Sequence, residues 1–326
     1  MSTLLTIANQ LIIYIGSGFF IFGNLGNVLN IIVMLRKTFN ASPCSRYLLA
    51  SSVSNLFFVN PVLILYIIGI INGGAPLLQN NFVWCKFTAL YLHTSSLTPL
   101  VCLALGTFDR YCSTSPSASI RLFSSIKIAN RTIVITVIFL TLVGLPTIFV
   151  NNIVYNQCAI TSITYMRYYA YFVVPIFYVL LPLSSMIYFG IRTFINIKNI
   201  RQRQIVVRTR GKRTEEQLAI MMSIQIIIIF VSAAIYYANI LYTVQTYAIV
   251  NKTIERLIIE SFVSLVIALE VYIIFTTHFY IYFATSSIYR KEVFKIIKCK
   301  SNRVHPVSTA QRNFTTRQNI PTVSVD

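Results

Sequence analysis

Seven long runs of apolar residues, separated by short polar segments, dominate the sequence. They cover approximately residues 11–35, 46–72, 83–112, 129–152, 168–197, 216–246 and 257–283. An α-helix needs about 20 residues to cross the hydrocarbon core of a bilayer, and each run is long enough. The clearest are RTIVITVIFLTLVGLPTIFV and IQIIIIFVSAAIYYANILY. The pattern therefore predicts an all-α membrane protein whose seven-transmembrane helix bundle extends over residues 11–283.

A short basic segment follows the seventh run and has the periodicity of a helix. In SSIYRKEVFKIIKCK, apolar residues recur at helix-like spacing with basic residues between them. This predicts an eighth, amphipathic helix over residues 287–298 that lies on the membrane surface. Cys299 at its end is a candidate palmitoylation site, and the alternative is a free cytosolic thiol. We expect a disordered cytoplasmic tail at 299–326 and a short extracellular N-terminus at 1–10.

The charge distribution predicts the orientation of these helices. Charged residues make up only 11% of the chain, whereas soluble domains carry about 25%. The net charge is +19, and all but four of the 27 Lys and Arg residues fall on the side of the odd-numbered connecting segments and the tail. Because basic residues collect on the cytoplasmic side, we expect a multi-pass plasma-membrane protein with its N-terminus outside and its C-terminus in the cytosol. Topology and contact with membrane lipid explain the positive charge without nucleic acid as a partner.

The third run ends in an acidic–basic pair, Asp109 and Arg110, within LALGTFDRYCSTS. Seven runs, an outside N-terminus, Asp-Arg-Tyr at the inner end of run three and a basic helix after run seven resemble the rhodopsin-like family of G-protein-coupled receptors. The likeness covers about residues 10–300 and includes Asn27 in GNVLNI and Tyr282, which precedes YRKE by seven residues. In this family the cysteine that opens the third helix is bonded to the second extracellular loop. The resemblance therefore implies a disulfide between the cysteines of this chain at those places, Cys85 and Cys158.

The chain also departs from the family pattern within the bundle. Run two carries Asn55 in place of the usual aspartate, and run three carries Pro99 in place of a serine. Run six has Ala233-Ala234-Ile235-Tyr236 where the family has Cys-Trp-x-Pro, and run seven has His278-Phe279 where it has Asn-Pro. The first two departures argue against the family's sodium site, and we expect no metal and no cofactor.

The resemblance implies a switch at the cytosolic end of the bundle. Asp109 would neutralise Arg110, and Glu215 or Glu216 at the start of run six would reach the same arginine. Outward movement of the sixth helix would break these pairs and expose Arg110 to a heterotrimeric G protein. The alternative is that the two glutamates only stabilise the N-terminus of their helix. The coupling and switch residues are thus expected to be Asp109, Arg110, Tyr111, Glu215, Glu216 and Tyr282.

The outer half of the bundle is where the family binds its ligands. Leu92 occupies the position of the aspartate found in amine receptors, and no lysine lies within run seven. A biogenic amine and retinal are therefore not expected, and a peptide is favoured over a small odorant-like molecule or a lipid. Glu270, a lone carboxylate near mid-membrane, is expected to contact His93, Asn55 or Asn239, with a purely structural role as the alternative. The candidate ligand-binding residues are Leu92, His93, Ser96, Tyr237, Leu241, Glu260 and Glu270.

Other functions have less support in the sequence. It contains no zinc-binding His-Glu-x-x-His, no Gly-rich phosphate loop and no Gly-x-Ser-x-Gly elbow, so we do not expect an enzyme. The alternatives are a transporter or channel and a seven-span chemoreceptor that does not couple to G proteins. Asn251 in NKT is a candidate glycosylation site on the outer side. Thr315 and Thr316 in the tail are candidate phosphorylation sites for arrestin binding.

Overall fold

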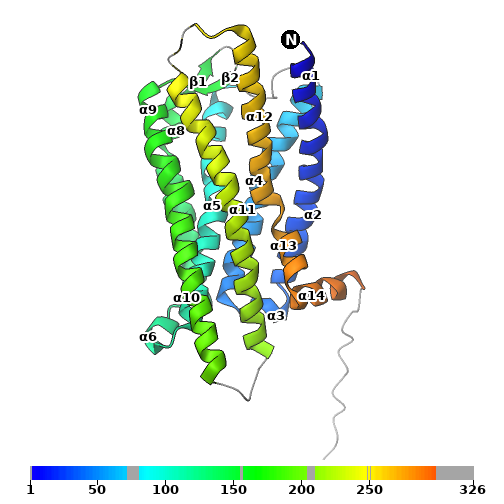
Figure 1. Cartoon of the computed structure of the whole chain (residues 1–326), viewed down its shortest axis with the longest axis vertical. Coiled ribbons are helices and arrows are strands. Elements are labelled where there is room, and N and C mark those ends of the chain that lie inside the picture. The colour runs from blue at the N-terminus through cyan, green and yellow to red at the C-terminus, as the bar shows by residue number, and fades with distance from the viewer. Residues whose placement is uncertain are drawn as a thin grey trace, which may run out of the picture.

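The computed structural model describes residues 2–71, 81–154, 157–203, 210–247, 249 and 251–298. Its elements in chain order are α1 (Ser2–Leu11), the π-helical η1 (Ile12–Gly16), α2 (Ser17–Met34), α3 (Lys37–Asn40), α4 (Pro43–Ile71), α5 (Phe82–Thr114), α6 (Ala118–Arg121), α7 (Ile126–Gly144), α8 (Pro146–Val150), β1 (Asn151–Val154), β2 (Gln157–Ile160), α9 (Ile163–Tyr168), the π-helical η2 (Tyr169–Leu180), α10 (Leu181–Arg203), α11 (Arg210–Thr246), α12 (Ile254–Thr276), α13 (His278–Thr285) and α14 (Ser287–Ile297). The long helices stand side by side as a bundle (Figure 1).

Seven helices in the described part of the chain are long and apolar enough to cross a membrane. The predicted seven-span bundle is confirmed, and the chain is a multi-pass membrane protein. The spans are Thr6–Met34, Pro43–Ile71, Phe82–Thr114, Ile126–Val150, Ile163–Ile200, Gln217–Thr246 and Ile254–Thr276. The first begins earlier than the sequence predicts, because helix starts at Ser2 and α1 occupies most of the segment expected as an N-terminal extension.

The outer faces of the helices carry large apolar side chains. Phe57 of α4 is 60% exposed, and Ile135 of α7 and Ile227 of α11 are each 65% exposed. In water such a surface would promote aggregation, but it matches the acyl chains of a bilayer. Inside the bundle the aromatic rings of Phe58 and Phe275 pack with their centroids 4.2 Å apart.

A buried polar cluster joins α2, α4 and the α12–α13 junction. The Asn27 amide donates to the carbonyl oxygen of Phe275 at 2.9 Å, and the Asn55 amide donates to Asn27 Oδ1 at 3.0 Å. Asn55 Nδ2 also lies 2.6 Å from Nδ1 of His278. Two of the departures from the family pattern, Asn55 and His278, are therefore direct partners, and the contact satisfies one buried polar atom of each. Asn55 Oδ1 and His278 Nε2 have no partner among the described residues.

The all-α expectation overlooks one element, the antiparallel hairpin of β1 and β2. Its register pairs Asn151 with Ile160 and Ile153 with Cys158. Each strand has only four residues, so neither gives a period-two pattern long enough to recognise. The hairpin covers one end of the bundle, the disulfide end, where the N-terminus also lies (Figure 1).

The short helices α3, α6 and α14 lie at the opposite end, which we call the Arg110 end (Figure 1). Helix α14 occupies the segment predicted as the eighth helix and runs across the bundle axis. Its buried Glu292 accepts hydrogen bonds from Thr38 Oγ1 at 3.0 Å and from Lys295 Nζ at 2.7 Å. The bond from Thr38 holds α14 to α3, and the bond from Lys295 lies within α14. The place of α14 on a membrane surface stays a prediction.

Candidate functional site

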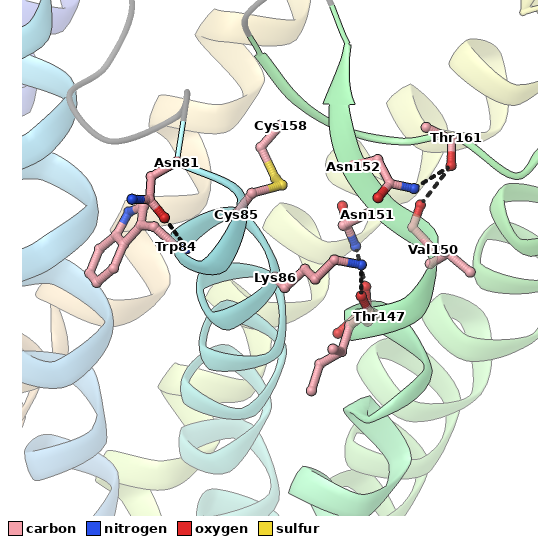
Figure 2. Close-up of a disulfide and its surroundings, with 11 residues drawn as sticks. Asn81, Trp84, Cys85, Lys86, Thr147, Val150, Asn151, Asn152, Cys158 and Thr161 are labelled. Atoms are coloured by element: carbon pink, nitrogen blue, oxygen red, sulfur yellow. Dashed lines mark hydrogen bonds between the residues drawn. A yellow bond between two sulfur atoms is a disulfide. The ribbon is translucent and has the colours of Figure 1, made fainter.

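The β1–β2 hairpin is tethered to the top of α5. The predicted disulfide between Cys85 and Cys158 is present, with the two Cα atoms 5.5 Å apart. Lys86 of α5 lies beside it (Figure 2), and its Nζ donates to the carbonyl oxygen of Ile148 at 2.8 Å, which holds α8, the helix that leads into the hairpin, to α5. Asn151, at the start of the hairpin, donates to the carbonyl oxygen of Thr147 at 2.7 Å. The hairpin is thus fixed over the disulfide end by covalent and polar contacts.

A cavity of about 370 Å³ lies at this end of the bundle. Asn151 and Ile160 of the hairpin line it, together with residues of α5, η2, α11 and α12. The described residues that line it include no Asp, Glu, Lys or Arg. Its polar groups are few and lie among aromatic and aliphatic side chains, which is the usual composition of a small-molecule site.

The π-helical segment η2 supplies one wall of the cavity. Tyr169, Val174, Tyr178 and Val179 all line it. In a π-helix the backbone bonds run from i to i+5 and each turn is wider than in an α-helix, so residues four or five positions apart lie near one face. Pro175 lies inside the segment and cannot donate a backbone hydrogen bond, which disturbs a regular α-helical ladder.

His93 of α5 is the most unusual side chain in the cavity wall. It is 4% exposed, and neither imidazole nitrogen has a hydrogen-bond partner among the described residues. Its ring lies between Tyr169 and Tyr178, with centroid distances of 6.4 and 6.2 Å. The absence of a side chain at Gly144 makes room for it, because a Cβ there would lie 2.6 Å from Cδ2 of His93.

Three of the seven candidate ligand residues, Leu92, His93 and Ser96, line this cavity. Tyr237, Leu241, Glu260 and Glu270 are not among its described lining residues. The sequence analysis did not select the tyrosines that line it, Tyr165, Tyr169, Tyr178, Tyr236 and Tyr272. The tyrosine-rich stretch TYMRYYAYF at the start of the fifth span was the available signal for two of them, Tyr165 and Tyr169.

Both candidate glutamates are occupied by partners on the protein. Glu260 forms ion pairs with Lys252 Nζ at 2.6 Å and with Arg256 Nε at 2.8 Å. One carboxylate oxygen of Glu270 accepts a hydrogen bond from Ser232 Oγ of α11. The expected partners of Glu270 were His93, Asn55 and Asn239, so the contact with Ser232 corrects that expectation.

At the Arg110 end, the acidic–basic pair is buried between helices. Arg110 Nη2 lies 2.7 Å from Asp109 Oδ2, and the two side chains are 2% and 4% exposed. The same nitrogen donates to Ser42 Oγ at 2.9 Å, and Ser124 Oγ donates to Asp109 Oδ1 at 2.8 Å. The neighbouring cavity measures about 10 Å³, which is no larger than about one water molecule needs. The pair is therefore neutralised and shut away from solvent at this end of the bundle in this conformation.

The other switch candidates connect this end to its neighbours. The Tyr282 hydroxyl donates to Gln225 Oε1 of α11 at 2.7 Å. The ring of Tyr111 packs against Phe189 of α10 with a centroid distance of 5.4 Å. The side chains of Glu215 and Glu216 lie outside the described part of the structure, as do Cys299, Thr315 and Thr316.

A residue that the sequence analysis overlooked, Gln217, joins α11 to the α13–α14 junction. Its Oε1 accepts hydrogen bonds from Ser286 Oγ and from the Ile288 amide, the latter at 2.9 Å. Its Nε2 donates to Ser287 Oγ at 2.9 Å. We call these three bonds the Gln217 clamp.

No protein-family model and no curated protein matches this chain. Seven apolar spans, a hairpin tethered by a disulfide and a buried Asp-Arg pair at the opposite end fit a seven-helix receptor. Among the described residues, no group of three or more His, Cys, Asp or Glu side chains could hold a metal ion. Asn251 is exposed in the segment before α12, and its glycosylation stays a prediction.

Proposed function

We propose that this chain is a G-protein-coupled receptor of the plasma membrane, similar to the rhodopsin-like family. In this proposal an extracellular ligand enters the cavity at the disulfide end. A heterotrimeric G protein binds at the Arg110 end once α11 moves outward. The N-terminus lies outside the cell and the C-terminal tail, with its candidate arrestin sites, lies in the cytosol.

One observation carries the proposal: a single helix, α5, contributes to two different sites, one near each of its ends. A ligand-sized cavity surrounds His93 near one end, and a closed, charge-paired arginine lies near the other. The 17 residues between His93 and Arg110 span about 25 Å of helix. A receptor needs such an arrangement, because binding on one side of a membrane must bias an equilibrium on the other.

The Arg110 end also offers a mechanism for that bias. The closed conformation holds α11 by the Gln217 clamp and by the bond between Tyr282 and Gln225. Moving α11 away from α5 would enlarge the small cavity that Arg110, Ala219 and Met222 line. The guanidinium would then face a cytosolic partner. A ligand favours this state only by as much as it binds the open conformation more tightly than the closed one.

Guanine-nucleotide exchange tests this proposal. Purified receptor in nanodiscs is mixed with a panel of heterotrimeric G proteins, and exchange is compared with that of empty nanodiscs. We expect exchange above background for the wild type and none for Arg110→Ala. The matched control is Arg121→Ala, because Arg121 at the same end bonds only backbone carbonyls of Ser115 and Pro116 in the described structure.

The rival transport function is tested with the same preparation. Proteoliposomes are assayed for ion and solute flux alongside nucleotide exchange. Flux that depends on Glu270, the intramembrane carboxylate, together with no exchange on any G protein, would replace the receptor by a transporter or channel.

A further inference from the structure

The cavity at the disulfide end restricts the charge of its ligand. A charged group placed there would lose its hydration, and the described lining offers no side chain of opposite formal charge to compensate. The volume of about 370 Å³ lies at the small end of the range of about 300–1,000 Å³ for small-molecule sites. Both features favour a small, uncharged occupant.

Several polar groups in the cavity already satisfy one another. Ser96 Oγ and the Tyr178 hydroxyl lie 3.1 Å apart, and the Tyr169 hydroxyl donates to Tyr178 at 3.5 Å. His93 differs from them, because both of its nitrogens are fully buried without a partner among the described residues. Buried polar side chains in folded proteins nearly always have hydrogen-bond partners, so this imidazole marks the place of a missing one.

We propose that this cavity binds a small, uncharged, mostly apolar molecule whose single hydroxyl or carbonyl group hydrogen-bonds to His93. A neutral imidazole has one donor and one acceptor nitrogen and matches either group. The tyrosine rings and aliphatic side chains around it contact the apolar remainder. This inference rests on the proposed function only in taking the cavity as the receptor's ligand site.

The same geometry disfavours a peptide, the class that the sequence analysis preferred. Each peptide residue other than proline brings one backbone donor and one acceptor that need partners when buried. Among the described lining residues, the groups left for a ligand are few and include the His93 nitrogens and the hydroxyls of Tyr165 and Tyr236. A peptide inserted here would leave most of its backbone groups unpaired, so a peptide is treated below as a contrary outcome.

A matched series of probes tests the ligand class without a known agonist. The full-length receptor in nanodiscs is titrated with octanol, octanone, octylamine and octanoate, which share a chain length and differ in their polar group. Binding is read as a saturable rise in melting temperature. We expect a response to octanol and octanone, and none to the ammonium or the carboxylate at equal concentration.

Three cavity variants and one control separate binding in the cavity from partition into the lipid. His93→Phe keeps a ring of similar size but cannot form the hydrogen bond, and should lower the affinity for the neutral probes by about tenfold. His93→Gln retains a donor and an acceptor and should restore most of the affinity. Ala233→Phe fills the cavity and should abolish the response. Phe87→Leu, on the exposed face of α5, should respond like the wild type.

Several results would overturn the proposal. These are equal responses to charged and neutral probes, no response to either neutral probe, a response unchanged in both His93→Phe and Ala233→Phe, or saturable binding of a peptide pool without binding of the neutral probes. Nucleotide exchange in the same preparations separates the two claims. Failed binding with exchange intact refutes the ligand class alone, whereas probe binding with no exchange on any G protein refutes the coupling alone.

Discussion

If the chain is the receptor proposed above, removing the Gln217 clamp should activate it without any ligand. Gln217→Ala deletes three hydrogen bonds between α11 and the α13–α14 junction. Each is worth about 0.5–1.5 kcal/mol net. The serine hydroxyls can bond to water in the variant, so we take about 2 kcal/mol as the loss from the closed conformation. That amount shifts the closed-to-open equilibrium by about thirtyfold.

The assay is basal guanine-nucleotide exchange, normalised to the amount of receptor at the cell surface. Ser287→Ala removes only one bond of the clamp and should give a smaller rise of about fivefold. Thr243→Ala, on the same helix near the disulfide end, loses a bond within its own helix and should leave exchange unchanged. Equal basal exchange in Gln217→Ala and wild type, at equal surface amounts, would refute the role of the clamp.

Three further outcomes are expected. Asp109→Asn removes the carboxylate that pairs with the buried Arg110 and should lower the free energy of unfolding by about 3 kcal/mol. Basal nucleotide exchange should rise as well, and a melting curve equal to that of the wild type contradicts this. Gly144→Ala places a Cβ 2.6 Å from the His93 ring and should cost about 1–3 kcal/mol and weaken octanone binding in the titration. Burial alone raises the pKa of Glu292, but hydrogen bonds from a lysine of α14 and a threonine of α3 outweigh it, so that the pKa lies below the ordinary 4.5. Its stabilisation of α14 is therefore complete above that value and is lost as the pH falls through the lower native pKa. Hydrogen exchange of α14 amides should rise there in the wild type and show no such step in Glu292→Gln.

The helices that cross the membrane could be predicted because the bilayer imposes a long, continuous apolar run on each of them. The disulfide followed from the family resemblance, since Cys85 and Cys158 occupy the places that the family pairs. The hairpin around Cys158 could not be recognised, because tertiary contacts with α5 and α8 hold strands that carry little signal of their own.

The cavity wall was harder to predict because its composition depends on an irregular helix. With regular α-helical spacing, a residue shares its face with those three or four positions away. In η2 the wider turn instead places Tyr169, Val174 and Tyr178, five and four positions apart, on the cavity side. No local pattern in the sequence announces that change of period.

The sequence analysis predicted polar contacts only for residues that carry a formal charge. The pairing of Glu260 with Arg256, four positions earlier, could have been read from helix periodicity. Gln217 carries no charge, and the sequence analysis assigned the switch role to the two glutamates that precede it. Its role appears only when the distant α13–α14 junction is brought beside it.

The unbroken helix α5 limits how a signal can cross this protein. It runs for 33 residues, about 50 Å, and carries both His93 and Arg110. A helix resists compression along its axis, so these two side chains keep a nearly constant separation. A conformational change that links the two ends must therefore occur as neighbouring helices shift past α5, which keeps its length. Helix α11 reaches from Tyr236 at the cavity to Gln217 at the clamp. It is therefore the helix whose movement relative to α5 would link the two ends.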